Sequence, residues 1–129
     1  MGIVDGTTSL LVRSALDALS MRHSVISNNI ANANSPDFKP KVLEFERQLY
    51  QALLDSSNTD IESHLIESFN KFEEELMNGS MIKESKDKTV ELDAEMARLT
   101  DTLLRYQALL EGLNKRSSVL KMAISEGRG

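Results

Sequence analysis

Two long apolar seams, one near each end of the 129-residue chain, set the strongest limit on how it can fold. The first seam recurs at alternating steps of four and three residues and comprises Val12, Leu16, Leu19, His23, Ile26, Ile30 and Ala33. The second keeps the same spacing over Leu92, Met96, Leu99, Leu103, Tyr106, Leu110, Leu113, Ser117, Leu120 and Ile124. This is the spacing of the a and d positions of a coiled coil, so it predicts helices over about 8–33 and 89–125.

Seams at opposite ends of a chain can pair only if the middle folds back. The sequence therefore predicts an all-α fold, with an antiparallel, coiled-coil-like pair of N- and C-terminal helices. The expected segments are an N-terminal helix (1–34), an extended turn with a short helix (35–54), a variable middle (55–88) and a C-terminal helix (89–129). Candidate N-terminal caps are Asp5, Thr7 or Thr8 for the first helix, and Asp87 or Thr89 for the last.

Further apolar residues lie beside the seams, and a two-helix hairpin would leave them partly exposed. They are Leu11, Val25, Leu104, Leu109 and Val119. Exposed apolar patches usually mark binding surfaces, so the isolated chain is predicted to be incomplete until it packs against other chains. The alternative is a small helical bundle whose middle helices cover these positions.

The middle of the chain begins with two prolines, Pro36 and Pro40, which end the first helix and favour extended backbone before them. Pro36-Asp37 suits the centre of a type I turn. A short helix is expected from Val42 to Leu54, with Val42, Phe45, Leu49, Ala52 and Leu53 on one side. A third is expected from a capping box at Thr59 and Glu62 to a stop at Asn78-Gly79, followed by a solvated connector over 80–88.

Composition narrows the classes of function. The net charge of −5 argues against a nucleic-acid surface, and the chain has no cysteine for a thiolate metal site or a thiol nucleophile. No metal, cofactor or catalytic constellation is predicted, because the chain's two histidines, His23 and His64, lie in different segments. His23 occupies a seam position and is interpreted as a packing residue. No apolar run reaches the about 20 residues of a membrane span, so direct insertion into lipid is not expected.

Four asparagines fall within seven residues, in the run NNIANANSPDF at 28–38. Asparagine amides compete for backbone groups in a helix, so such a cluster needs fixed partners. The run resembles the N-terminal signature of the bacterial flagellar rod and hook family. The two terminal regions as a whole resemble the rod subunits of its proximal end. The distinguishing runs are LEFE, which follows the prolines, and DAEMARL and LRYQAL in the last predicted helix.

The resemblance implies a structural, non-enzymatic subunit of the flagellar basal-body rod. It implies packing against copies of the chain, other rod proteins, and the adaptor protein and membrane ring at the rod base. It also implies a periplasmic location reached through the flagellar type III export apparatus. Phe45 and Leu49 resemble that apparatus's short export motif, while Asn28, Asn29, Asn32 and Asn34 would brace the turn or contact neighbouring subunits.

The alternative function is a cytoplasmic helical-bundle adaptor or export chaperone. Such a protein would share the apolar seams of the two terminal helices. It would have no use for the asparagine-rich turn, so the turn favours the rod subunit.

Overall fold

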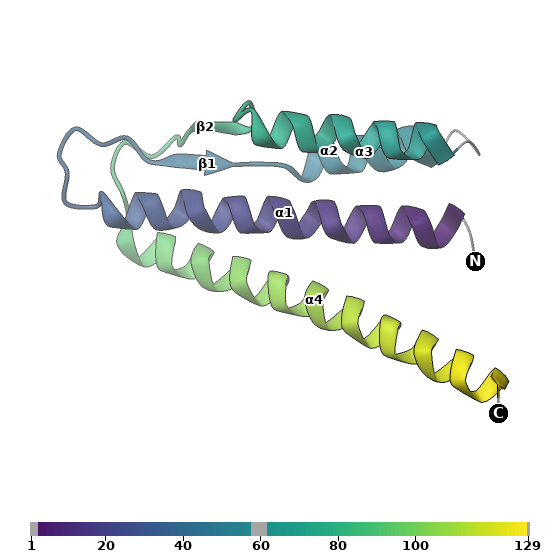
Figure 1. Cartoon of the computed structure of the whole chain (residues 1–129). Helices are drawn as coiled ribbons and strands as arrows, with labels where there is room; N and C mark the ends of the chain where they lie inside the picture. The colour runs from purple at the N-terminus through teal and green to yellow at the C-terminus, as the bar shows by residue number, and fades with distance from the viewer. Residues whose placement is uncertain (1–2, 58–61, 129) are drawn as a thin grey trace.

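The computed structural model describes residues 3–57 and 62–128, with side chains placed for residues 6–56 and 63–115. In chain order its elements are helix α1 (Ile3–Ala31), strand β1 (Lys41–Leu43), helices α2 (Glu46–Ser57) and α3 (Glu62–Met77), strand β2 (Ile82–Glu84) and helix α4 (Leu92–Arg128). Figure 1 shows α1 in the middle, with α2, α3 and the strands along one side and α4 along the other. The α4 helix runs antiparallel to α1 and diverges from it toward its own C-terminal end (Figure 1).

Helix dominates the described chain, so the all-α prediction is confirmed in broad terms. The predicted helix starts are wrong. The α1 helix already begins at Ile3, so Asp5, Thr7 and Thr8 lie inside it instead of capping it. The α4 helix begins at Leu92, where the carbonyl of Glu91 accepts the amide of Glu95, so neither Asp87 nor Thr89 is its cap.

The turn after α1 follows the predicted geometry. The amide of Phe38 donates to the carbonyl of Ser35 at 3.2 Å, which encloses Pro36 and Asp37 as the two central residues. A type II turn needs a positive φ at its third residue, which here is Asp37. No non-glycine residue of the described backbone has a positive φ, so the turn is not of type II. The asparagine-rich segment therefore leads into a turn that needs no glycine.

A two-stranded antiparallel sheet replaces two of the predicted features. Lys41–Leu43 pairs with Ile82–Glu84, so the helix predicted from Val42 begins only at Glu46. The predicted solvated connector over 80–88 contains β2, and its Met81 is buried in the core. Here the backbone hydrogen bonds are made between two strands that are far apart in the sequence. Such a long-range contact leaves no periodic pattern of apolar residues in either short segment.

The α3 helix ends as predicted. Its last residue is Met77, and Gly79 follows with a φ of 81°, in the left-handed region that favours glycine. The amide of Gly79 donates to the carbonyl of Leu76, which closes the helix end. Thr59, the proposed cap at the other end of this helix, lies outside the described residues.

The apolar core lies between α1 and the layer formed by β1, α2 and α3. Its buried members are Ala18, Leu19, Leu43, Phe45, Leu49, Ala52, Phe69, Phe72, Leu76 and Met81. Leu11 and Val25 pack partly against this core, as the bundle alternative predicts for α1. None of the buried apolar residues found among the described side chains comes from α4. We call α1, the two strands, α2 and α3 the body, and α4 the arm.

Candidate assembly surface and its polar anchor

The predicted seam of α4 divides between two faces of that helix. Leu99, Tyr106 and Leu113 are half-buried, and they belong to an inner face that also contains Glu95, Thr102 and Leu109. The other seam residues remain 38–50% exposed and form what we call the α4 ridge: Leu92, Met96, Leu103 and Leu110. The prediction that the whole seam pairs with α1 is therefore wrong for the residues of the ridge. The side chains of Ser117, Leu120 and Ile124 lie outside the described residues.

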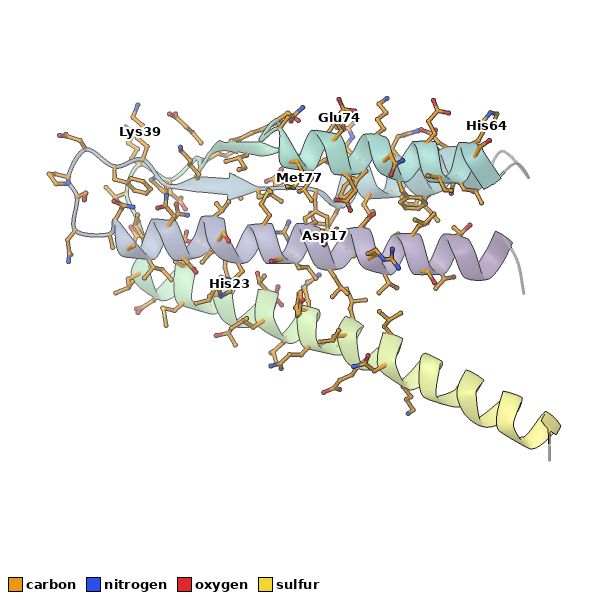
Figure 2. All side chains as sticks on the ribbon, in the orientation of Figure 1. Asp17, His23, Lys39, His64, Glu74 and Met77 are labelled. Carbon is orange, nitrogen blue, oxygen red and sulfur yellow. The ribbon has the colours of Figure 1, made fainter. Side chains whose placement is uncertain are left out.

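The seam of α1 is better covered. Leu19 and Ile26 are buried, whereas the other described members are half-buried: Val12, Leu16, His23, Ile30 and Ala33. Figure 2 places His23 on the side of α1 that faces α4. At 3.6 residues per turn, Leu16 and His23 lie on the same flank of the antiparallel pair as the α4 ridge. The two helices therefore share one apolar flank that the body does not cover.

Asn29 joins α1, β1 and α4 through its side-chain amide. Its Nδ2 donates to the carbonyl of Lys41 at 2.7 Å and to Glu95 Oε2 at 3.3 Å. Its Oδ1 accepts the amide of Lys41 at 2.9 Å. Asn29 is 1% exposed and Glu95 is 5% exposed, so water competes little for these bonds. The other oxygen of Glu95, Oε1, accepts from Arg98 Nη1 at 2.7 Å.

The side-chain amide of Asn29 makes the hydrogen bonds to Lys41 that the backbone of a neighbouring strand would make. The carbonyl of Pro40 accepts the amide of Ser85, so in this antiparallel register the backbone groups of Lys41 and Leu43 point away from β2. Asn29 binds both groups of Lys41, and Arg22 donates to the carbonyl of Leu43 from Nε at 3.0 Å and from Nη2 at 2.8 Å. Side chains of α1 thus bind three of the four backbone groups that Lys41 and Leu43 turn toward the outer edge of β1.

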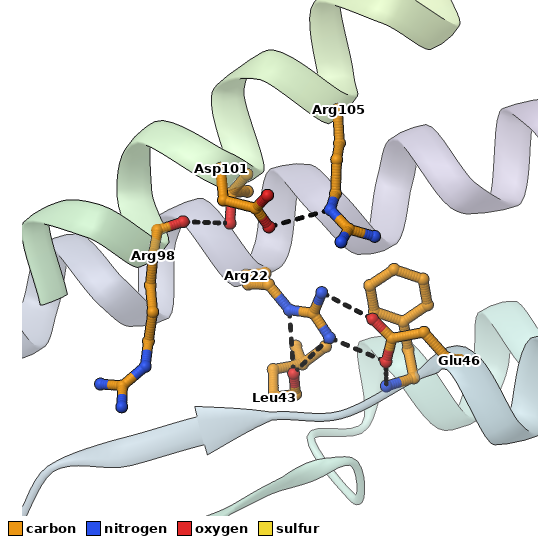
Figure 3. A network of polar contacts seen from close by, with 8 residues as sticks. Arg22, Leu43, Glu46, Arg98, Asp101 and Arg105 are labelled. Atoms are coloured by element: carbon orange, nitrogen blue, oxygen red, sulfur yellow. Dashed lines mark hydrogen bonds and ion pairs between the residues drawn. The ribbon is translucent and has the colours of Figure 1, made fainter. Parts of the chain in front are cut away.

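Arg22 also fixes the start of α2, as Figure 3 shows. Its Nη1 pairs with Glu46 Oε1 at 2.7 Å, its Nη2 donates to Oε2 at 2.9 Å, and its guanidinium lies 4.4 Å from the centre of the Phe45 ring. Burial by itself would raise the pKa of Glu46. The hydrogen bond from Arg22, backbone hydrogen bonds and the charge of Arg22 outweigh it, so the pKa lies below 4.5.

The other asparagines of the cluster are placed differently. Asn32 Nδ2 donates to the carbonyl of Asn28 at 2.8 Å, one turn back along the helix, and to Asn28 Oδ1 at 3.2 Å. Asn28 and Asn34 are exposed. Within the chain, then, Asn29 braces the turn, Asn32 binds locally, and the exposed pair remains open to solvent or to neighbours.

A carboxyl pair, the exposed Asp17 and the half-buried Glu73, links α1 and α3 at the surface of the body. Glu73 hydrogen-bonds to Asp17 and to the buried Ser14. Burial, followed by the hydrogen bond and the charge of Asp17, raises the pKa of Glu73 to about 7, against the effect of Ser14. Figure 2 shows Asp17 on α1, below the α3 layer.

Sequence reasoning missed Arg22, Glu95 and the Asp17–Glu73 pair. A signal existed only for Glu95: residues 95, 99, 102, 106, 109 and 113 also follow the 4-3 spacing, with polar side chains at the first and third places. Phe45 and Leu49 were predicted to lie on the apolar side of the short helix, and this part of the prediction is confirmed. Both are buried, and the amide of Leu49 donates to the carbonyl of Phe45 at 2.9 Å.

Two features of the described residues bear on other classes of function. No helix among them is long and apolar enough to cross a membrane. Within the same residues, no group of three or more His, Cys, Asp or Glu side chains is arranged to hold a metal ion. What the described surface offers instead is an apolar flank with a buried polar anchor beside it.

Known proteins resemble the chain both in its asparagine-rich region and over most of its length. The sequence profile of the flagella basal body rod proteins matches residues 12–39, which include α1's seam and the asparagine cluster. The flagellar basal body rod protein FlgB of Cereibacter sphaeroides is 30% identical over 112 residues, covering 85% of this chain and 88% of that protein. The chain belongs to the FlgB family of flagellar basal body rod proteins.

Two further relatives agree with that assignment. FlgB of Bacillus subtilis is 28% identical over 130 residues, covering 99% of this chain and the whole of that protein. FlgB of Borreliella burgdorferi is 46% identical over 56 residues, covering 43% of this chain and 40% of that protein. The resemblance predicted from the asparagine cluster and the two terminal runs is thus confirmed at the level of the family.

Proposed function

We propose that this chain is a non-enzymatic structural subunit that polymerises into the proximal rod of the flagellar basal body, the drive shaft that carries motor torque. Its partners are copies of itself, other rod proteins, and the adaptor protein and membrane ring at the rod base. It reaches the periplasm through the flagellar type III export apparatus. Membership of the family supports the location in the flagellar basal body, and the apolar surface of α4 supports assembly by contacts between helices.

The observation that carries the proposal is the α4 ridge. Leu92, Met96, Leu103 and Leu110 present apolar side chains along one line of a helix that the body covers only on its inner face. Apolar lines of this kind are stabilised by a partner surface. A contact between unlike surfaces of successive copies does not close, and it generates a helical filament. We propose that α1 and α4 become a regular coiled-coil pair when such contacts form around them.

A charge on the ridge tests this mode of assembly. Leu103→Asp is expected to abolish swimming and to leave no rod in electron micrographs of basal bodies, because a carboxylate would be buried without a partner. The matched control is Ala108→Asp, which puts the same side chain at an exposed α4 position off the ridge. Intact rods built from the Leu103→Asp chain would overturn the assignment of the ridge.

Export is tested separately at Phe45. Phe45→Ala is expected to prevent secretion in a flagellated strain, because the side chain is proposed to be read before the chain folds. Phe72→Ala is the control, since it removes a phenylalanine that is equally buried in the core but lies outside the motif. Equal secretion of the two variants and the parent would contradict the motif. It would leave the role of the ridge intact.

A further inference from the structure

One apolar line of the inner face of α4 repeats after a shift of seven residues along α1. Leu99, Tyr106 and Leu113 are seven residues apart and all half-buried, whereas the second line changes from Glu95 to Thr102 to Leu109. The α1 seam has the same period, with Leu19 and Ile26 as its buried members. A seven-residue slip of one helix along the other, about 10 Å, would therefore preserve the apolar contacts of the first line.

Glu95 is the residue that such a slip would displace from its partner. It faces Asn29 in the observed register, and Thr102 would take its place one heptad later. The hydroxyl of Thr102 already donates to the carbonyl of Arg98 at 2.8 Å, within its own helix. Asn29 would then lose its carboxylate acceptor, although its bond to Lys41 would remain.

We propose that Asn29 and Glu95 form a register lock: they select one axial position of α4 on α1 from the positions that the apolar repeat allows. Single buried polar residues set register in this way in coiled coils, where apolar contacts alone permit several alignments. Glu95 is a positioning residue in this role.

The partners of the lock keep it in one place. Asn29 is held from the side of the body, because Lys41 binds both its Nδ2 and its Oδ1. Glu95 is held from the side of the arm by Arg98, whose side chain is half-exposed and reaches toward Asp87. Each half is thus oriented within its own part of the chain before the two parts meet.

The connection between the strands and the arm would permit a slip. Residues 85–91 join β2 to α4 without helix or strand. A segment without regular structure can lengthen toward an extended reach of about 24 Å for seven residues. No helix or strand in this connection couples β2 rigidly to α4, so a non-covalent contact is the better candidate for fixing the register.

Register also decides where the α4 ridge lies relative to the half-buried seam of α1. A slip would move Leu103 and Leu110 by about 10 Å along that shared flank. This consequence rests on the proposed function, whereas the lock itself is a property of the single chain. The two can therefore fail separately.

Spin labels on the full-length chain measure the register directly. The chain has no cysteine, so Ser9→Cys and Ala97→Cys accept labels selectively. Both positions are exposed, and they lie toward opposite ends of the antiparallel pair, so the distance between them runs mainly along the helix axes. In the parent chain a single distance distribution is expected from pulsed electron spin resonance.

Glu95→Leu is expected to add a second population about 10 Å longer, because the apolar repeat then no longer discriminates between the two alignments. Its helix content should be retained: Asn29 keeps Lys41, and Arg98 keeps access to water. If this variant fails to fold, Glu95→Ala is used with the same expectation. Glu95→Gln keeps an oxygen that accepts from Asn29 Nδ2, so it should restore the single parental distance.

The matched control is Thr102→Val, which removes the other buried polar group of the inner face, one heptad along. Its hydrogen bond lies within α4, so the parental distance should not change. A single parental distance in both Glu95→Leu and Glu95→Ala would overturn the lock, as would two populations in the parent chain. A second population in Thr102→Val would also overturn it, because register would then not depend on the Asn29–Glu95 contact.

Discussion

The body and the arm are stabilised in different ways. The body buries phenylalanine and leucine side chains from α1, β1, α2 and α3 around one core. The described part of the arm buries only Glu95 and Thr102, and its apolar side chains are half-buried or exposed. The body thus contains its own apolar interior, while the arm adds half-buried apolar side chains such as Tyr106 and Leu109, one buried polar contact, and an apolar line left on its surface.

This contrast separates the part that completes its core within one chain from the part that is proposed to depend on neighbours. Hydrophobic stabilisation grows with the apolar area removed from water, so the body gains most of it within a single chain. The arm can gain a comparable amount only when another surface covers the α4 ridge. Predictions that separate the two parts therefore measure how far the difference extends.

The largest effect is expected in the body. Leu76→Ala removes a fully buried side chain from the core and should lower the free energy of unfolding by about 3 kcal/mol. Leu104→Ala removes the same atoms from a residue of the arm that is 60% exposed, and it should change that free energy by less than about 0.5 kcal/mol. Urea unfolding followed by circular dichroism measures both. Equal losses would remove the distinction between body and arm.

An intermediate effect is expected where the two parts meet. Asn29→Ala leaves both backbone groups of Lys41 and one oxygen of Glu95 without their partner, so it should cost about 2 kcal/mol in the same urea measurement. Asn28→Ala is the control, because that asparagine is exposed and its side chain contacts only Asn32 in the hydrogen bonds described. A neutral Asn29→Ala would show that the anchor contributes nothing to the stability of the chain.

The smallest effect is expected from the carboxyl pair between α1 and α3. The pKa of Glu73 is about 7 in the folded chain, against an ordinary value of 4.5 that applies to the unfolded chain. Between pH 4.5 and pH 7, folding is therefore accompanied by the uptake of a proton. Stability from this group is present below pH 4.5 and is lost as the pH rises through 7. Since Glu73 is partly exposed, screening limits the loss to about 1 kcal/mol.

Glu73→Gln should remove that pH dependence. Thermal unfolding should therefore show the stability of the variant rising relative to that of the parent chain between pH 5 and pH 8. Glu74→Gln changes the charge equally at an exposed neighbouring position and should run parallel to the parent chain. Parallel profiles for both variants would show that the pKa of Glu73 is not raised by its burial and by Asp17.

Most of the helices could be predicted from residue spacing, because periodic burial leaves a local record in a sequence. The α3 stop at Gly79 could be predicted for the same reason, since a left-handed residue is a local requirement. The β1–β2 pairing could not, because Lys41 and Glu84 are brought together by the whole fold. Their segments are too short to show alternation of apolar and polar residues.

The site was predicted in part. The apolar seams were found, but their division into an inner face and a ridge depends on how α4 is rotated against α1, and alternating steps of four and three do not specify that rotation. The importance of the asparagine cluster was found as well. Which asparagine is buried depends on the position of Lys41 and Glu95, far away in the sequence.

The edge of β1 has a consequence for crowded conditions. Open strand edges recruit strands from other molecules, and such pairing leads to aggregates. On the side of β1 that faces away from β2, Asn29 and Arg22 already occupy both backbone groups of Lys41 and the carbonyl of Leu43. A foreign strand would have to displace these side chains before it could pair with β1 on this side of the molecule.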